Sequence, residues 1–419
     1  MTRIARGYSM TIYDAVIIGS GAAGGVIAKE LSIKNKKVLV LEKGGFVEEA
    51  KAYRAYDIVF SGVEIWRAIA VGGSTLVTFG NAVPVLINEL KSFGIDIVDE
   101  IEELNNELHI SPMPCNFIGN ATKSFIEAAR NLGLTIKLMP KIIDPKKCLT
   151  TCKHCTAGCI TGAKWSSLKN IREAMSLGAK IVTRVSKVRI LTSGGKVKGI
   201  RYIVNGIEKE INTNIVVTCA GALGTPEILF SAGIEDNVGE GLFTDVFITV
   251  GGIVKDIMLN REQDMLAYVK LEHGILSPFF SVFLKPKFIC KGIKANPKDI
   301  MGIMVKIADA SSGKVHKDGK VSKPLTDYDI DLLKKYSEKA LEILEAMGAD
   351  MKTVVATYPR GVHPGGTAAI GKVVDKNLET EIRGLYVADA SVLPKAPGAP
   401  PMLTIMALAK YLAKKLVET

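Results

Sequence analysis

The first part of the chain alternates short apolar runs with polar turns and one glycine-rich loop. The run Ala15–Ile18 has the length of a strand and is bounded by polar residues and glycines, which predicts a buried strand. An amphipathic stretch with helical spacing follows to about Ser32, and the run "KVLVLE", which ends in Glu42, predicts a second strand. Two buried strands joined by a helix favour a parallel β–α–β unit.

The remaining pattern predicts helices first and then a mixture of strands and helices. Residues 86–140 are amphipathic at helical spacing, as in "DIVDEIEELNNEL". Residues 179–234 alternate β-type runs with the turns "SGGK" and "VNG", which predicts a meander that returns to a buried strand, "IVVTCAG". A helix is expected after it, with Thr225 as its cap. Residues 246–354 give a weaker signal, and the C-terminal end is expected to be a strand, a loop and a helix.

Two glycine-rich loops suggest a nucleotide site. Gly19, Gly21 and Gly24 form G-x-G-x-x-G between the first expected strand and helix. The first glycine permits a tight turn, the second lets a pyrophosphate approach the backbone, the third lets helix and strand pack closely, and Glu42 would accept hydrogen bonds from a ribose. This arrangement predicts dinucleotide binding; the alternative is a β–α–β unit whose glycines serve packing alone. The second loop, "AVGGSTLVTFGNAVP" (residues 70–84), is glycine-rich and flanked by apolar residues, and a plain turn is the alternative interpretation of it.

Composition and charge indicate a globular protein without a nucleic-acid partner. The 419 residues exceed one ordinary core, so two domains or one large α/β domain with an insertion are expected. The net charge of +11 comes from lysines spread along the whole chain, with no basic block interleaved with aromatic residues, so we expect a solvated surface. Gln263 is the sole glutamine in a chain rich in Lys and Glu, which favours a thermophilic source.

The sequence shows no targeting or membrane segment. The start, "MTRIARGYSMTIYDAV", has no apolar signal core, and no run of eighteen apolar residues follows. We therefore expect a soluble cytoplasmic protein without a transmembrane segment. Cysteines in that compartment are reduced, so clustered cysteines are expected to be ligands or redox groups.

Four of the seven cysteines lie within twelve residues: Cys148, Cys152, Cys155 and Cys159. Their spacing is C-x3-C-x2-C-x3-C. A zinc site usually takes two ligand pairs separated by a dozen or more residues, whereas one tight loop of four thiolates is typical of iron–sulfur ligation. The loop therefore favours an iron–sulfur cluster, most simply 4Fe–4S. Zinc, and structural cysteines that are reduced or paired in disulfides, are the alternatives.

Four separated motifs occur in a fixed order along the chain: "IIGSGAAGG", "GGST", "AGALGTPEILFSAGI" and "HPGGTAAIG…GLYVADASVLPKAPGAPPMLTIMALA". Together they resemble the glucose–methanol–choline (GMC) flavin oxidoreductases, and "GCITGAKWS" resembles the branch with long-chain alcohol oxidases and bacterial sugar or polyol dehydrogenases. The resemblance implies an α/β fold, with a Rossmann-like FAD-binding domain and a smaller α+β substrate domain. The expected parts are a discontinuous FAD-binding domain (1–90, 160–245 and 355–419), a helical segment (91–147), the cysteine-rich loop (148–159) and the substrate domain (246–354).

The resemblance also implies roles for single residues. The first glycine motif and Glu42 would hold the ADP half of FAD, and a further set would surround the adenine, pyrophosphate, ribityl chain and flavin ring. That set is Gly72, Gly73, Ser74, Val185, Gly221, Ala222, Asp389, Ala390, Pro401 and Met402. His363, in "HPGGT", matches the active-site histidine, and an imidazole suits the removal of a hydroxyl proton during hydride transfer. The family usually has Asn or His before the proline that starts the last helix, but this chain has Pro400, which offers no donor or base.

The expected function is an FAD-dependent dehydrogenase that oxidises a CH–OH group of a small alcohol, polyol or hydroxy compound. A cluster beside the flavin would pass electrons singly to a protein acceptor, which argues against an oxidase. Some dehydrogenases of the resembling branch carry a 3Fe–4S cluster, so three of the four cysteines would suffice. Pro400 keeps open a flavin-dependent reductase fed by ferredoxin through the cluster. A third alternative is an electron-transfer flavoprotein subunit without a substrate of its own.

Overall fold

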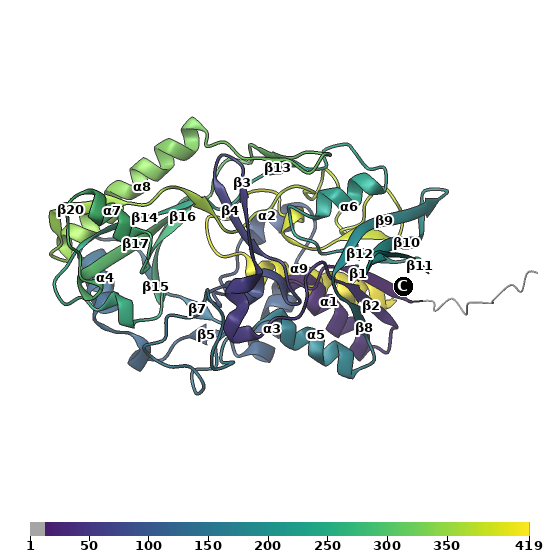
Figure 1. The fold of residues 1–419 in the computed structure, drawn as a ribbon, viewed down its shortest axis with the longest axis horizontal. Coiled ribbons are helices and arrows are strands. Elements are labelled where there is room, and N and C mark those ends of the chain that lie inside the picture. The colour runs from purple at the N-terminus through teal and green to yellow at the C-terminus, as the bar shows by residue number, and fades with distance from the viewer. Residues whose placement is uncertain (1–12, 419) are drawn as a thin grey trace, which may run out of the picture.

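The computed structural model describes residues 13–418. Residues 1–12 and residue 419 lie outside the described residues. The expected FAD-binding domain includes these positions, and the expectation that the chain has no signal core also concerns residues 1–12. The described chain is elongated, with a parallel sheet at one end and a larger sheet at the other (Figure 1). Every helix between residues 13 and 418 is too short or too polar to cross a membrane.

The parallel sheet joins strands from the start, middle and end of the chain. Its order is β22-β12-β1-β2-β8, and every neighbouring pair is parallel. Each position of β1, β2 and β12 is buried, because both faces of the sheet are covered, and this is why these strands are continuous apolar runs. The bounds are β1 (Ala15–Ile18), β2 (Val38–Leu41), β8 (Lys180–Val182), β12 (Val216–Thr218) and β22 (Leu385–Val387).

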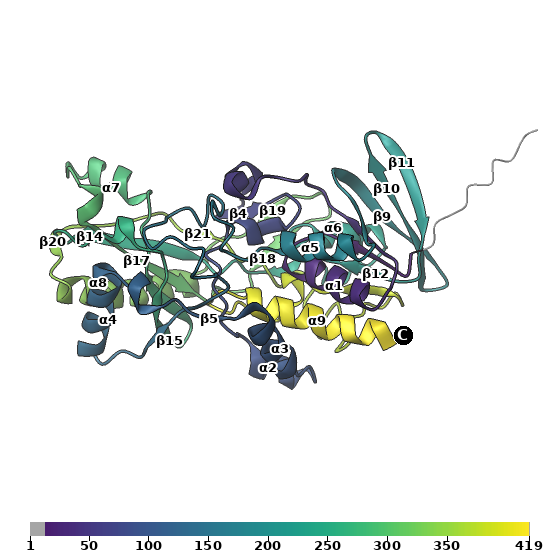
Figure 2. The ribbon, with the colours of Figure 1, turned by 90° about the horizontal axis from the view of Figure 1, so that it is seen from below.

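Helices from distant parts of the chain pack beside this sheet. The first helix, α1, contacts both α5 and the C-terminal helix α9, and α9 also contacts α3 (Figure 2). The expected C-terminal helix is therefore a neighbour of the helix that follows the first glycine loop. The bounds are α1 (Ala22–Ile33), α2 (Ile87–Ser92), α3 (Val98–Leu108), α5 (Ser167–Ser176), α6 (Thr225–Ser231) and α9 (Met402–Glu418).

The described chain also contains three smaller sheets, of three, three and two strands. The expected meander is an antiparallel sheet in the order β11-β10-β9. Its strands are β9 (Val185–Ser193), β10 (Lys196–Val204) and β11 (Ile207–Asn212). The other two sheets contain β13 (Glu240–Leu242), β18 (Gly313–Val315) and β19 (Val321–Ser322), and β5 (Ser111–Pro112) with β7 (Pro140–Lys141). Short 3₁₀ turns lie at η1 (Glu49–Ala55), η2 (Gly73–Val77), η3 (Cys115–Phe117), η4 (Leu259–Arg261), η5 (Pro297–Asp299) and η6 (Ala390–Val392).

The large sheet has nine strands and draws on more of the chain than residues 246–354. Its order is β3-β4-β21-β14-β17-β16-β15-β6, and β20 also pairs with β14. The strands are β3 (Tyr56–Phe60), β4 (Glu64–Ala68), β6 (Ile136–Leu138), β14 (Phe247–Ile253), β15 (Ala267–Leu271), β16 (Gly274–Pro278), β17 (Ile300–Ile307), β20 (Asp350–Ala356) and β21 (Arg360–Gly361). The helices at this end are α4 (Asn120–Asn131), α7 (Leu284–Cys290) and α8 (Asp327–Ala346).

The central strand β17 separates the second core from the functional cavity. All eight of its residues are buried. Met301, Ile303, Val305 and Ile307 belong to one apolar cluster with residues of α4 and α8. Successive side chains of a strand point to opposite faces, so the alternate residues face away from these helices. The side chains that reach the cavity from this strand are Ile300, Met304 and Lys306.

Candidate active site

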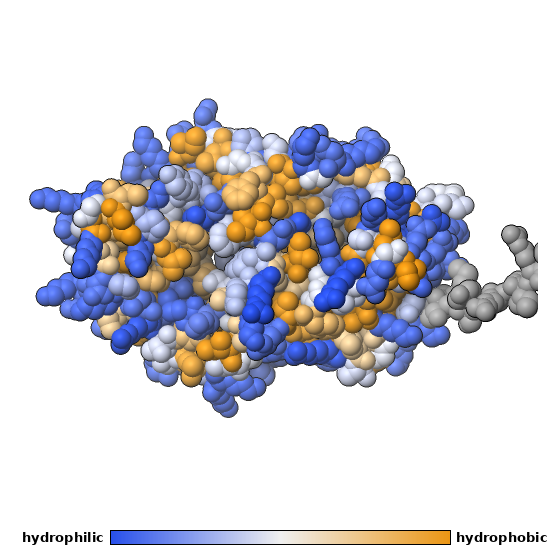
Figure 3. Space-filling view, in the orientation of Figure 1, coloured by the Kyte–Doolittle hydropathy of each residue, from blue (hydrophilic) through white to orange (hydrophobic). Residues whose placement is uncertain are grey.

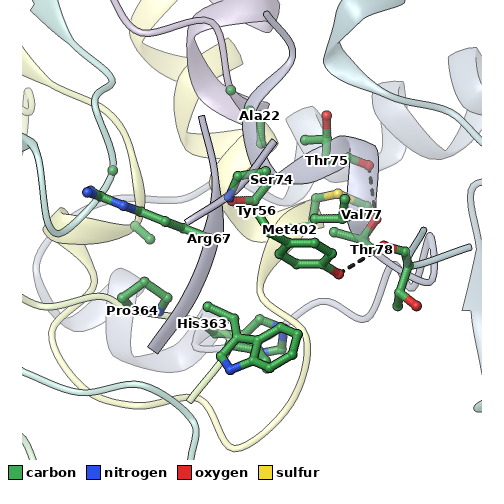
Figure 4. Close-up of a pocket in the computed structure, with 18 of the residues that line it drawn as sticks. Ala22, Tyr56, Arg67, Ser74, Thr75, Val77, Thr78, His363, Pro364 and Met402 are labelled. Atoms are coloured by element: carbon green, nitrogen blue, oxygen red, sulfur yellow. Dashed lines mark hydrogen bonds between the residues drawn. The ribbon is translucent and has the colours of Figure 1, made fainter. Parts of the chain in front are cut away.

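A cavity of about 1180 Å³ is lined by residues from both ends of the molecule. The parallel-sheet end contributes both glycine loops, and the large sheet contributes β14 and β17. Figure 4 shows Tyr56, Ser74, Met402 and His363 around this space. Apolar residues also gather in the middle of the molecular face drawn in Figure 3, over the region of β3 and β4.

The first glycine loop has the geometry of a phosphate cradle. Gly19 has a φ of +100°, and a Cβ there would lie 2.2 Å from the carbonyl oxygen of Cys219. A Cβ on Gly24 would lie 2.0 Å from the carbonyl oxygen of Gly19, so this glycine is needed for close packing of helix and strand. A Cβ on Gly21 would meet nothing within 4 Å, and Gly21 begins α1 without a side-chain cap. The first amides of α1 therefore face open cavity, which suits the pyrophosphate of FAD.

Glu42 is buried where β2 ends, and it ties the two glycine loops together. Its Oε2 accepts hydrogen bonds from the amide of Ser20 at 3.0 Å and from the hydroxyl of Ser20 at 2.6 Å. Its Oε1 accepts one from the amide of Gly44 at 2.7 Å, and the Gly72 amide donates to the Ser20 hydroxyl at 3.0 Å. Burial raises the pKa of Glu42, although these donors oppose the shift.

Asp389 performs the corresponding structural task at the end of β22. Its Oδ2 accepts hydrogen bonds from the Gly221 amide at 2.8 Å and from the Thr225 hydroxyl at 2.6 Å, while Oδ1 accepts from the Ser391 amide at 2.8 Å. The expectation that Thr225 caps α6 was wrong, because the cap position is Gly224 and the Thr225 hydroxyl is engaged by Asp389. Asp389 thereby orders two loops that line the cavity.

Most residues that the sequence marked for the cofactor line this one cavity, although they come from distant segments. Gly24 and Gly72 do not line the cavity. Gly24 allows α1 to pack closely against the Gly19 backbone, and the amide of Gly72 donates a hydrogen bond to the hydroxyl of Ser20. Gly73 presses against the first loop, since a Cβ there would lie 3.0 Å from the Cα of Gly21. The residues on the cavity wall are Gly19, Gly21, Glu42, Gly73, Ser74, Val185, Gly221, Ala222, Asp389, Ala390, Pro401 and Met402, together with His363.

His363 lies on the cavity wall with its ring oriented by a buried carboxylate. Its Nδ1 is 3.0 Å from Oδ2 of Asp245, whose side chain is fully buried and whose Oδ1 accepts a hydrogen bond from the Gly398 amide at 2.8 Å. The side chain of His363 is 21% exposed, and within residues 13–418 its Nε2 has no hydrogen-bond partner. Asp245 accepting from Nδ1–H leaves Nε2 as an acceptor toward the cavity. Sequence reasoning missed Asp245, which no motif marks.

Lys306 is a second polar group that sequence reasoning missed. It is 1% exposed, and its Nζ donates to the main-chain oxygen of Asp245 at 3.3 Å and lies 5.0 Å from the ring centroid of Phe247. Its sequence signal is a single charge within the apolar run "IMGIMVKIA". Neighbouring positions of that strand belong to a core, and lysine is rarely buried without a function or a partner. The lone charge in the apolar run could therefore have marked Lys306 as a candidate site residue.

The ionisation of these three groups is interdependent. Burial lowers the pKa of His363 well below its usual value, and the charge of Lys306 lowers it further. Burial raises the pKa of Asp245 to about 7 against the opposing effect of Lys306, and burial lowers the pKa of Lys306 to about 8. The imidazole is therefore neutral near pH 7, which is the state that a base requires.

The cysteine-rich loop is adjacent to the same cavity. Lys153, Thr156 and Ala157 line the cavity, and the Tyr56 hydroxyl donates to the Thr156 carbonyl at 2.9 Å. Beneath the loop, the buried ammonium of Lys164 donates to carbonyl oxygens of Leu76 (2.8 Å), Thr78 (2.7 Å) and Cys155 (2.8 Å). One side chain therefore connects the cysteine-rich loop to the second glycine loop.

The four thiols of this loop are free and partly buried. Gln263 donates to the Cys148 sulfur at 2.7 Å, and the Lys164 amide donates to the Cys159 sulfur at 3.3 Å. Among residues 13–418, no group of three or more Cys, His, Asp or Glu side chains is gathered closely enough to hold a metal ion. The arrangement thus supplies the donor chemistry of a cluster without the converged geometry, and the cluster stays a prediction.

Comparisons with known proteins agree with this geometry. Two family models, both of the GMC oxidoreductases, match residues 87–246 and 310–409. An uncharacterised protein of Methanocaldococcus jannaschii is 35% identical and covers 97% of this chain and 100% of its own length. A long-chain-alcohol oxidase of Arabidopsis thaliana is 24% identical over 97% of this chain and 67% of its own. A formate oxidase variant of Aspergillus oryzae shares the fold, with a TM-score of 0.75 at 16% identity over 98% of this chain and 99% of that one.

The two matched segments together span more than half of the chain, and they contain Val185, Gly221, His363, Asp389 and Met402 of the cavity wall. The predicted family and the predicted α/β fold, with a Rossmann-like domain and a substrate domain, are confirmed. The chain belongs to the GMC oxidoreductase family, and it is an FAD-dependent oxidoreductase that acts on alcohol-type donors.

Proposed function

We propose that the chain oxidises a CH–OH group in the cavity between its two sheets and that His363 is the base. The observation that carries this proposal is the pairing of His363 with Asp245, which leaves Nε2 unprotonated and directed to the cavity. Nε2 takes the hydroxyl proton while the carbinol C–H bond breaks and the C–O bond becomes a carbonyl. FAD, when bound, supplies the acceptor for the hydride that carries the two electrons.

The cofactor would be held by the loops that line the parallel-sheet end of the cavity. The amides that begin α1 would bind the pyrophosphate, Glu42 the ribose, and Val185 the adenine region through its backbone. Pro401 and Met402, at the start of α9, would lie beside the flavin ring. These assignments rest on the common cavity and on the open space above Gly21.

Substitution of the base tests the proposal. His363→Ala is expected to slow anaerobic flavin reduction by an alcohol substrate by about 10²–10⁴-fold, the usual contribution of a positioned general base, while FAD stays bound. The matched control is His273→Ala, because His273 is exposed and does not line the cavity. Unchanged reduction in His363→Ala would remove His363 from the reaction.

We further propose that electrons leave the flavin through the cysteine-rich loop, by way of an iron–sulfur cluster on Cys148, Cys152, Cys155 and Cys159, to a protein acceptor. The ligand spacing supports a 4Fe–4S cluster, or 3Fe–4S on three of the thiols, and the contact of this loop with the cavity supports a short path. The thiols would have to converge on assembly, since they are not gathered for a metal in the described structure. A relay of this kind makes the enzyme a dehydrogenase.

Anaerobic purification with iron and sulfide analysis tests the relay. About four irons per flavin, or about three for a 3Fe–4S cluster, lost in Cys152→Ser and kept in Cys290→Ser, would support it, because Cys290 is exposed on α7 and outside the loop. Flavin absorption without stoichiometric iron would contradict the cluster but leave the proposed alcohol oxidation intact.

A further inference from the structure

Lys306 places a buried ammonium group on the cavity wall next to the base. Within residues 13–418 its single hydrogen bond is to the main-chain oxygen of Asp245, at the long distance of 3.3 Å. An ammonium group has three N–H donors, so two of them have no partner. Burial of an incompletely paired charge is costly, and a ligand that supplies an anion or further acceptors lowers this cost.

The neighbouring carboxylates attract Lys306 through space but do not pair with it: the charges of Asp245 and Asp309 raise its pKa against the larger effect of burial, and the one hydrogen bond of its Nζ among the described residues goes to a main-chain oxygen. The carboxylate of Asp245 is directed to the imidazole of His363, and its backbone rather than its side chain contacts Lys306. The carboxylate of Asp309 pairs with the fully buried Lys323 at 3.0 Å. Each nearby acid already has its own partner, so the open side of Lys306 is the cavity.

The position of Lys306 points to the substrate rather than to the cofactor. It comes from β17 of the large sheet, whereas the glycine loops and the start of α9 belong to the opposite end. Asp245 contacts Lys306 through its main-chain oxygen and His363 through its side chain. One residue therefore holds the ammonium and the base on the same side of the cavity, only a few bonds apart.

We propose that Lys306 binds a carboxylate of the substrate, and that the substrate is a 2-hydroxy acid whose carbinol carbon carries that carboxylate. The proposal rests on the alcohol oxidation proposed above. The carbinol C–H and O–H bonds break, the hydride carries two electrons to FAD, the proton goes to His363, and the product is the 2-oxo acid with its carboxylate unchanged. Lys306 then provides the polar contact that Pro400, also on the cavity wall, cannot make.

Stopped-flow reduction of the FAD-loaded protein under anaerobic conditions tests the substrate class. Glycolate and lactate are compared with the neutral diols of matching size, ethylene glycol and 1,2-propanediol. We expect kred/Kd to favour the hydroxy acids, and Lys306→Met to remove about 10- to 100-fold of that preference, as for a lost hydrogen bond to a charged group. Lys306→Arg is expected to keep part of the preference for hydroxy acids. The control Lys285→Met, which replaces an exposed lysine at the rim of the cavity, is expected to keep the whole preference.

Binding of oxalate, an unreactive dicarboxylate, gives a readout that does not need turnover. Its titration against flavin absorption is expected to give a Kd that Lys306→Met weakens about 10- to 100-fold. If Lys306→Met fails to retain FAD, Lys306→Gln replaces it in both experiments. Equal oxalate affinity in wild type and variant, or a diol preference, would overturn the role of Lys306 and leave alcohol oxidation standing. Tight oxalate binding without reduction by any alcohol would instead overturn the proposed oxidation.

Discussion

Nδ1 of His363 lies 3.0 Å from Oδ2 of Asp245, a residue 118 positions earlier in the chain. The carboxylate holds the ring in one orientation and selects the tautomer with its proton on Nδ1. Asp245 has a left-handed backbone with a φ of +49°, which is uncommon for a residue other than glycine. The Gly398 amide donates to the carboxylate of Asp245, and the Lys306 ammonium donates to its main-chain oxygen. We infer that the uncommon backbone conformation is retained because it places the carboxylate beside His363.

The first prediction concerns this carboxylate. Asp245→Asn is expected to slow flavin reduction by about 10²–10⁴-fold, because an amide can donate to Nδ1 and favour the tautomer with no acceptor at Nε2. FAD content and the substrate Kd are expected to change little. A variant with full activity and an unaltered pH profile would show that Asp245 serves folding alone.

The pH dependence of flavin reduction follows from the raised pKa of Asp245 and the lowered pKa of Lys306. Activity is expected to rise with pH through about 7, where Asp245 loses its proton, and to fall above about 8, where Lys306 loses its charge. His363 does not set the lower limb, because burial holds its pKa well below 6.5. Asp245 and Lys306 affect each other's ionisation, so the two limbs describe the pair together rather than either residue alone. The charge of Asp309, which also acts on Lys306, adds to this mutual effect.

Profiles of kred/Kd from pH 5 to 9 check this expectation. Asp245→Asn is expected to remove the lower limb, and Lys306→Met the upper limb. A single limb near the ordinary pKa of a histidine, retained in Asp245→Asn, would contradict the assignment.

Two glycines of the first loop are expected to separate folding from cofactor binding. Gly24→Ala introduces a Cβ 2.0 Å from the Gly19 carbonyl oxygen, so it should lower the thermal stability of the apoprotein. Gly21→Ala introduces a Cβ into open space and should leave the apoprotein stable, but it should weaken FAD binding by blocking the approach of the pyrophosphate. Thermal melts of the apoproteins and FAD titrations measure the two effects. Equal FAD affinity in Gly21→Ala and wild type would place the pyrophosphate elsewhere.

An ion-pair network on α9 is expected to contribute to thermal stability. Lys410 pairs with Glu30 at 2.9 Å, Glu103 at 3.3 Å and Glu107 at 3.4 Å, so it joins α9 to α1 and α3. Such networks are common in thermophilic proteins, because the penalty for desolvating charges falls as temperature rises. Lys410→Met should lower the melting temperature by a few degrees, because among the described residues Glu30 loses its partner while Glu103 and Glu107 keep only Lys414 and Lys29.

The control for this network is an isolated surface pair. Lys314→Met removes the partner of Glu240, and both side chains are largely exposed, so the expected change in melting temperature is near zero. Equal small shifts in the two variants would show that the network adds nothing to stability.

Much of the parallel-sheet end of the molecule was predictable because its signals are local. A strand, a glycine loop and a helix follow one another between Ala15 and Ile33, and each is specified by neighbouring residues. The motif order from "IIGSGAAGG" to "PPMLTIMALA" likewise implied a common site, and the cavity brings together the residues from these motifs. Thr225 shows the limit of local signals, since its hydroxyl bonds to Asp389, 164 positions away.

The sequence by itself determined the family, the cofactor and His363 as the candidate base, since these depend on short motifs with a fixed local geometry. Only the tertiary structure decided what surrounds that base. Asp245 and Lys306 belong to no motif, and their approach to His363 depends on the register between β14 and β17 and on which face of β17 the helices α4 and α8 cover. A shift of one residue in that register would turn the side chain of Lys306 away from the cavity and into the core. The position of the ammonium group beside His363 therefore depends on how the strands pair in the folded sheet.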